Sequence, residues 1–334
     1  MPNIEQFIKN IKDRILNKGE ISFEEALFLG EYEFKDNEIF LLLLNSADEI
    51  RKKFNGDKFD LCTIVNAKSG NCSEDCSYCA QSSYYNTGAV TYELMNEKEI
   101  MKAACEVEEG GVDKFSLVTS GRGLEIGEEL YNLKNIYEKL DTERNLSLCA
   151  SHGIISYEVG KSLKESGVMT YHHNLETSRN FYPSICTTHD YQERIDTCHN
   201  AKKAGMKICS GGILGLGESR KDRIEMAFEL KNLDVDSIPI NILTVIEGTA
   251  IALDNYELIK PLEVIKTAAI YKFIVPRAVI RFAGGRHLLG DEFERKGIRG
   301  GVSATLTGNY LTTMGSTIER DRGIAGEAGY VLKK

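Results

Sequence analysis

The chain has 334 residues, 42% of them hydrophobic and 27% charged, and its formal net charge at pH 7 is −9. This composition is typical of a globular protein with a sizeable core, and the negative charge argues against a nucleic-acid or anionic-membrane partner. The N-terminal stretch lacks the apolar centre of a signal peptide, and the longest aliphatic run, 39–44, is too short to span a bilayer. We therefore expect a cytoplasmic protein whose nine cysteines bind metal, act in catalysis or lie buried, without forming disulfides.

The first part of the chain has the pattern of helices. Apolar residues recur at helical spacing over residues 3–56, and Ser22 followed by Glu25 predicts a capping box. We interpret 1–56 as an N-terminal helical extension. It would either cap the bottom of the following domain or lie along its side.

From residue 57 to 334, short apolar runs alternate with amphipathic helices. The expected strands are 61–66, 114–119, 146–151, 168–173, 207–212, 237–243, 279–283 and 301–306. The expected helices are 97–109, 128–140, 156–165, 191–204, 221–233, 262–275 and 291–296. Such alternation predicts a parallel sheet with right-handed crossovers, and eight strands over about 250 residues match an α/β TIM barrel. A doubly wound open sheet is the alternative.

The loop after the first expected strand reads NCSEDCSYCAQ and contains Cys72, Cys76 and Cys79. Three thiolates this close in sequence can face one metal centre, yet they leave a four-coordinate centre one ligand short. Another part of the chain, a substrate or a cofactor must then supply the missing ligand. A zinc knuckle or simple surface cysteines are the alternatives, although zinc motifs usually bring paired Cys-x2-Cys units or a nearby His, and the loop contains no His.

Several expected strands carry polar or thiol side chains where a barrel ordinarily has Val, Ile or Leu. These residues are Ser116, Cys149, His172, Cys209, Asn241 and Arg281. Because about half of the residues of a barrel strand point inward, the pattern indicates an enclosed reaction chamber at the centre of the barrel.

The three-cysteine loop, with Tyr78 before its last cysteine, resembles the signature of radical S-adenosylmethionine (SAM) enzymes. The resemblance implies that the three thiolates hold a 4Fe–4S cluster and that SAM supplies the missing ligand. The blocks NCSEDCSYCAQSSYYNTG, YHHNLETS, TTHDYQERIDT, CSGGILGLGE and VPRAVIRFAGGR are similar to the biotin synthase family over about residues 60–310. That family implies TIM-barrel homodimers that cleave SAM to a 5′-deoxyadenosyl radical and insert sulfur into dethiobiotin to form biotin. It further implies an auxiliary iron–sulfur cluster as sulfur donor, and flavodoxin or ferredoxin as electron donor.

The resemblance also implies roles for individual residues. Tyr78 would lie near the adenine of SAM and Arg194 near its carboxylate. Asn174 and Glu176 would bind the ribose, although the family more often has Asp at the second position. Asn174 and Asn241 match positions close to dethiobiotin, whose ureido ring needs both donors and acceptors, as an Asn amide supplies.

The auxiliary-cluster site departs from the family pattern. The family holds a 2Fe–2S cluster with three barrel cysteines and one arginine, and Cys149, Cys209 and Arg281 match three of these positions. The fourth position is Ser116, and serine has no thiolate to bind iron. Our hypothesis is that Cys186, on the loop after the fourth strand, replaces the missing cysteine in a cluster of different nuclearity. The alternative is that Cys186 is a small buried residue.

Two alternatives to this function stay open. A related radical SAM enzyme, similar to the iron–iron hydrogenase maturase or to methylornithine synthase, would share the barrel and the first cysteine motif. A non-catalytic iron–sulfur or zinc protein would use the cysteines without cleaving SAM. Cys149, Cys209 and Arg281, together with the YNTG and CSGGILGLGE blocks, favour the biotin synthase interpretation over the first alternative.

Overall fold

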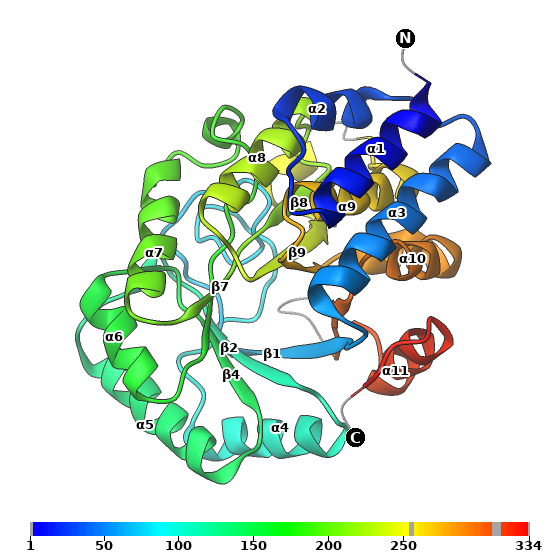
Figure 1. Cartoon of the computed structure of the whole chain (residues 1–334). Helices are drawn as coiled ribbons and strands as arrows, with labels where there is room; N and C mark the ends of the chain where they lie inside the picture. Colours follow the sequence, from blue (N-terminus) through cyan, green and yellow to red (C-terminus); the bar gives the residue numbers. More distant parts are fainter. Residues whose placement is uncertain (1–2, 254–256, 309–314, 333–334) are drawn as a thin grey trace.

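The computed structural model describes residues 3–253, 257–308 and 315–332. Within these residues, eight parallel strands form a closed barrel (Figure 1). In order around the barrel they are β1 (Asp60–Lys68), β2 (Lys114–Thr119), β4 (Ser147–Ser151), β6 (Thr170–His172), β7 (Lys207–Cys209), β9 (Ser237–Ile242), β10 (Val279–Phe282) and β11 (Ala304–Leu306). The pairing of β11 with β1 closes the ring. The predicted TIM barrel is therefore confirmed, and the open sheet is wrong.

Three short strands lie beside the barrel strands. β8 (Gly212–Leu214) pairs with the end of β9, and β3 (Gly123–Leu124) pairs with β5 (Ile154–Ile155) in a separate small sheet. They follow β7, β2 and β4 in the chain, at the carboxyl ends of those strands. The barrel therefore has extra structure at the end where active sites of this fold lie.

Helices surround the strands, as the amphipathic pattern predicted. They are α4 (Glu97–Glu109), α5 (Glu128–Glu143), α6 (Tyr157–Glu165), α7 (Tyr191–Lys203), α8 (Arg220–Asn232), α9 (Pro261–Ile274) and α10 (Gly290–Arg299). Asn96, Asp190 and Ser219 form capping boxes at the starts of α4, α7 and α8, which satisfy backbone N–H groups that the helix itself leaves unpaired. Single 3₁₀ turns are η1 (Tyr182–Ser184), η2 (Ala250–Leu253) and η3 (Arg286–Leu289).

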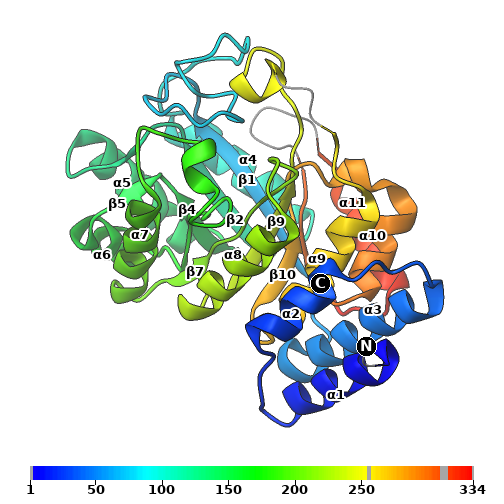
Figure 2. The same cartoon turned by 90° about the horizontal axis from the view of Figure 1, so that it is seen from above.

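The N-terminal helices lie along the side of the barrel (Figure 2). They are α1 (Ile4–Leu16), α2 (Phe23–Glu31) and α3 (Asn37–Asn55). α2 packs against α8 and α9, α3 packs against α9 and α10, and α1 packs against α3. The predicted capping box of Ser22 and Glu25 is present at the start of α2. α9 is buried on nearly all sides, because these helices cover the face that it turns away from the barrel. The buried Lys266 donates from Nζ to the carbonyl of Gly30 at 2.8 Å and so links α9 to α2.

One helix near the C-terminus, α11 (Ile318–Glu327), was not expected from the sequence. It lies beside α10, where Arg286 pairs with both Glu294 and Asp321 at 2.6 Å. In the described parts of the chain, no helix combines the length and the apolar character that crossing a membrane requires.

Candidate active site

A cavity of about 450 Å³ lies inside the barrel and opens at the carboxyl ends of its strands. Each of the eight barrel strands contributes at least one side chain to its wall. The six polar or thiol residues singled out on the strands all line it: Ser116, Cys149, His172, Cys209, Asn241 and Arg281. A barrel interior that is packed with aliphatic side chains would leave no such space, so the structure has the chamber that these residues indicated.

The three-cysteine loop lies at the mouth of this cavity, and Cys72, Cys76 and Cys79 all line it. Backbone hydrogen bonds from Cys72 N to Gln81 O (3.0 Å) and from Cys79 N to Cys76 O (3.0 Å) fold the loop back on itself. Gly70 begins the loop with φ 77°, and an added Cβ there would lie 2.3 Å from Thr91 Oγ1. Only glycine fits this turn, which points the following cysteines toward the barrel axis.

Burial affects the protonation of these thiols. It raises the pKa of Cys72 and raises the pKa of Cys79 to about 11. A hydrogen bond to Cys186, together with burial, raises the pKa of Cys76. The thiols therefore stay protonated at neutral pH unless a bound cation stabilises the thiolates, as metal binding does. Three thiols from one short loop fit a cluster with one iron left open to a small molecule.

A polar group of the half-buried Asn174 and the buried Glu176 and Arg194 adjoins the cysteine loop. Asn174 Nδ2 donates to Glu176 Oε2 at 3.3 Å, and Arg194 Nη1 donates to the Asn174 carbonyl at 2.8 Å. Arg194 Nη1 also lies 3.7 Å from Glu176 Oε1. Glu176 has φ 69°, which is rare for a non-glycine residue and often marks a functional position. Tyr78 lines the same part of the cavity, so the four residues expected to bind SAM lie together.

The deeper part of the cavity contains a second set of thiols. Cys149 and Cys209 line it as expected, and so does Cys62, which sequence reasoning had left undecided between the two faces of its strand. Cys62 and Cys149 share a hydrogen bond, which lowers the pKa of Cys62 to about 6, with a further contribution from the charge of Arg281. Cys62 therefore belongs to this site. Alternate residues of β1 face opposite sides of the strand, but the sequence does not say which of the two sets faces the cavity.

Arg281 completes the deep thiol cluster of Cys62, Cys149 and Cys209. Its Nη1 lies 4.0 Å from Cys209 Sγ, whereas its Nε and Nη2 are buried without a hydrogen-bond partner among the described residues. A buried guanidinium ordinarily satisfies all its donors, because an unpaired charged donor is costly. Three thiols around an incompletely paired arginine therefore fit an anionic, sulfur-rich group bound in the cavity.

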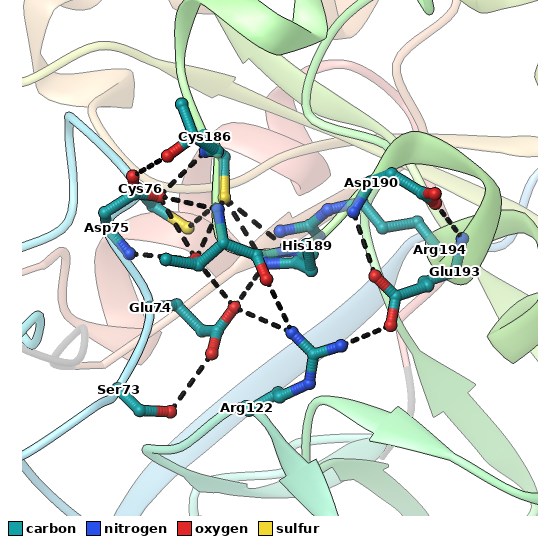
Figure 3. Close-up of polar contacts among 12 residues, drawn as sticks. Ser73, Glu74, Asp75, Cys76, Arg122, Cys186, His189, Asp190, Glu193 and Arg194 are labelled. Carbon is teal, nitrogen blue, oxygen red and sulfur yellow. Dashed lines mark hydrogen bonds and ion pairs between the residues drawn. The ribbon is translucent and has the colours of Figure 1, made fainter.

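The position of Cys186 corrects the prediction made for it. Its Sγ lies 3.7 Å from Cys76 Sγ and 3.3 Å from His189 Nδ1, and it does not line the cavity that holds Cys149 and Cys209 (Figure 3). The loop after β6 carries it toward the cysteine loop, where Ser77 N donates to Ile185 O at 2.8 Å. Cys186 is thus a neighbour of the first thiol group, and Cys62 is the cysteine that lines the cavity together with Cys149 and Cys209.

Asn241, at the end of β9, is held from two sides. Its Nδ2 donates to Gly212 O at 3.2 Å, and its Oδ1 accepts from Gly284 N at 2.9 Å. An amide carries two donor hydrogens and two acceptor positions, so one of each stays free toward the cavity. The side chain can therefore offer a fixed donor and acceptor to a bound molecule.

Comparisons with known proteins agree with this architecture. The model of the Radical SAM superfamily matches residues 67–230, and that of the Biotin and Thiamin Synthesis associated domain matches residues 239–331. A biotin synthase from Clostridioides difficile (strain 630) is 50% identical over 329 residues, which cover 98% of this chain and 100% of the relative. A biotin synthase from Fusobacterium nucleatum subsp. nucleatum is 49% identical over 333 residues, 99% of this chain and 92% of the relative.

Two solved structures share the fold. Methylornithine synthase superposes with a TM-score of 0.83 at 16% identity, covering 97% of both chains. A maturase of the FeFe-hydrogenase superposes with a TM-score of 0.83 at 17% identity, covering 98% of this chain and 75% of the other. At such low identity these likenesses show the fold alone.

A closed parallel barrel with three cysteines at the mouth of its cavity, together with the superfamily match, defines a radical SAM enzyme. Such an enzyme uses a 4Fe–4S cluster and SAM. Within this class, the chain belongs to the biotin synthase family, because relatives of that name are about half identical to it over nearly its whole length.

Proposed function

We propose that this chain converts dethiobiotin to biotin by radical sulfur insertion inside the barrel cavity. The observation that carries the proposal is that one cavity joins two thiol groups. Cys72, Cys76 and Cys79 lie at its mouth, and Cys62, Cys149 and Cys209 lie deeper in the same space. A reactive carbon radical must meet only its intended partner, so a closed chamber between a radical source and a sulfur source suits this chemistry.

At the mouth, Cys72, Cys76 and Cys79 would hold the 4Fe–4S cluster. When bound and reduced, that cluster supplies the electron that cleaves SAM to methionine and a 5′-deoxyadenosyl radical. Arg194 is fixed by Tyr182 OH at 2.7 Å and by the Asn174 carbonyl at 2.8 Å, so its charge is held ready for a carboxylate. Asn174 and Glu176 would bind the ribose, and Tyr78 would pack near the adenine.

Deeper in the cavity, Cys62, Cys149, Cys209 and Arg281 would hold the auxiliary iron–sulfur cluster that donates the sulfur. The proposal replaces Cys186 by Cys62, because Cys62 shares a hydrogen bond with Cys149 and lines the cavity with it. Ser116 lies opposite Cys149 on the neighbouring strand. As a neutral hydroxyl, Ser116 would border this cluster without binding its iron.

Dethiobiotin would bind between the two groups. Asn174 and Asn241 both line this part of the cavity, and each amide can bind the ureido ring. The rest of the wall there includes aliphatic side chains such as Ile213 and Leu306, which suit the aliphatic chain of the substrate.

We also propose that flavodoxin or ferredoxin reduces the protein and that it works as a homodimer in the cytoplasm. The electron donor and the homodimer rest on the family resemblance. Size-exclusion chromatography with light scattering would measure the oligomeric state, and reduction by purified flavodoxin or ferredoxin would test the donor.

The direct test is anaerobic reconstitution of the clusters, followed by incubation with SAM, a reductant and dethiobiotin. We expect biotin and 5′-deoxyadenosine, each measured by mass spectrometry. A protein that forms 5′-deoxyadenosine but never biotin would contradict the proposal and indicate another radical SAM reaction. A colourless protein that binds zinc and leaves SAM intact would contradict the whole class of mechanism.

A further inference from the structure

A buried group of metal-binding atoms lies beside the cavity, where the cysteine loop meets the loop after η1 (Figure 3). Its members are Cys76, Cys186 and His189, whose ligand atoms all lie within 4.8 Å of one another. Each of the three side chains is at least nine-tenths buried. Thiolate and imidazole are the preferred ligands of zinc and similar divalent metals.

Two of the three separations between these atoms match a tetrahedral metal site. A metal ion with bonds of about 2.3 Å to sulfur and about 2.0–2.1 Å to nitrogen separates two sulfurs by about 3.8 Å, and sulfur from nitrogen by about 3.6 Å. The observed separations are 3.7 Å between Cys76 Sγ and Cys186 Sγ, and 3.3 Å between Cys186 Sγ and His189 Nδ1. Both separations agree with those of a metal site to within a few tenths of an ångström, and the third, between Cys76 and His189, is within 4.8 Å.

Glu74 lies beside His189, outside this group of three. Its Oε2 accepts a hydrogen bond from His189 Nδ1 at 2.6 Å, so an ion at that nitrogen would displace the shared hydrogen. Thr188 Oγ1 donates to the same oxygen at 2.8 Å, and Arg122 Nη1 lies 3.2 Å from it. These contacts fix the carboxylate, so a negatively charged group stays beside the place of a bound cation.

The other nitrogen of His189 also has the partner that a metal-binding histidine needs. His189 Nε2 lies 2.8 Å from Tyr182 OH, and Arg194 Nε donates to the same hydroxyl at 2.7 Å. Because the Glu74 carboxylate only accepts hydrogen bonds, Nδ1 carries the hydrogen in the ion-free protein and Nε2 accepts from Tyr182 OH. When an ion binds Nδ1, the imidazole hydrogen moves to Nε2, where the Tyr182 oxygen can accept it.

We propose that Cys76, Cys186 and His189 bind one divalent transition-metal ion in the protein before an iron–sulfur cluster is inserted. Binding of the ion rests on this geometry alone. Its consequence rests on the proposed function: Cys76 serves both sites, so the ion and the 4Fe–4S cluster exclude each other. A bound zinc ion would then hold the enzyme in a cluster-free form.

Cobalt titration of the cluster-free, full-length protein tests the site. Co²⁺ bound by thiolates in tetrahedral geometry gives intense charge-transfer and visible absorption bands, so each occupied site can be counted. Because the other cysteines also bind Co²⁺, the comparison is between the natural protein and variants. We expect Cys186→Ala and His189→Gln each to lose one equivalent of tightly bound Co²⁺, whereas Cys105→Ala, outside the site, keeps it. Circular dichroism verifies that each variant is folded. Unchanged stoichiometry and spectra in both variants would overturn the proposal.

Competition with zinc tests whether the ion and the 4Fe–4S cluster exclude each other. The natural protein and Cys186→Ala receive one equivalent of Zn²⁺ before anaerobic reconstitution, and the iron bound at the cysteine loop is then measured. We expect Zn²⁺ to lower this iron content in the natural protein and to have at least about tenfold less effect in the variant. Equal inhibition of both would overturn the mutual exclusion. Failure of the natural protein to take up a 4Fe–4S cluster without Zn²⁺ would instead contradict the proposed function.

Discussion

Ser116 and Cys149 lie directly opposite each other on β2 and β4, and both line the barrel cavity. A hydroxyl therefore stands beside a thiol where the family resemblance implies two cysteines. The neighbouring strand β1 brings Cys62 into contact with Cys149 instead. The deep thiol cluster thus keeps three cysteines, although one of them comes from a different strand.

The first prediction separates Cys62 from Cys186. Cys62→Ala should lose most of the iron and sulfide of the auxiliary cluster and all biotin formation, because a methyl group cannot bind iron. The 4Fe–4S cluster at the mouth should remain, measured by electron paramagnetic resonance of the reduced protein. Cys186→Ala is the matched control and should retain the auxiliary iron and sulfide. A loss in Cys186→Ala with normal content in Cys62→Ala would restore the original hypothesis.

The second prediction concerns Arg194. Arg194→Lys keeps the charge but cannot maintain both the bond to Tyr182 and the bond to the Asn174 carbonyl. Hydrogen bonds to charged groups contribute about 1.5–3 kcal/mol, so SAM affinity should fall roughly 10- to 100-fold. Equilibrium binding to the reconstituted protein measures it. The exposed Arg179→Lys should bind SAM normally, and an unchanged affinity in Arg194→Lys would contradict the assigned role.

The third prediction concerns Asn241. Asn241→Ala should weaken dethiobiotin binding by about tenfold, since the ureido ring would lose one donor and one acceptor. SAM cleavage should continue, so the ratio of 5′-deoxyadenosine to biotin should rise. Asn232→Ala, on the exposed end of α8, is the control. An unchanged ratio together with normal dethiobiotin affinity would place the substrate elsewhere in the cavity.

The fourth prediction is a pH dependence at the closed, N-terminal end of the barrel. Asp60 is largely buried, which by itself would raise its pKa, but ion pairs with Lys114 (2.7 Å) and Lys58 (2.9 Å) lower the pKa to about 2. Because the folded pKa lies below the ordinary value of 3.8, folding favours the charged carboxylate. This contribution of about 2 kcal/mol is complete above about pH 4 and is lost as the pH falls toward 2.

Asp60→Asn should therefore lower the free energy of unfolding by about 2 kcal/mol at pH 7, and the difference should vanish near pH 2. Urea unfolding of the cluster-free protein at a series of pH values measures this. The exposed Asp196→Asn serves as control. A difference that stayed constant across the series would show that the effect comes from packing and not from the charge.

Much of the fold followed from local sequence patterns. The spacing of apolar residues predicted the order of strands and helices, because the apolar period that distinguishes a helix from a strand is set by residues that are close in sequence. The Ser22–Glu25 capping box was confirmed for the same reason, since its partners are three residues apart. α11 was missed, because its stability depends on contacts with α10 and with Arg286, which are distant in sequence.

The sequence by itself determined the barrel class and the three-cysteine loop, because both depend on short-range spacing. The tertiary structure alone decided which other thiols meet. Cys62 faces the cavity because the register of β1 turns that side of the strand inward, and Cys186 meets Cys76 although 110 residues separate them. Such contacts depend on which side of a strand faces the cavity and on where a loop runs in the folded protein. They arise only when the barrel closes, and no local pattern encodes them.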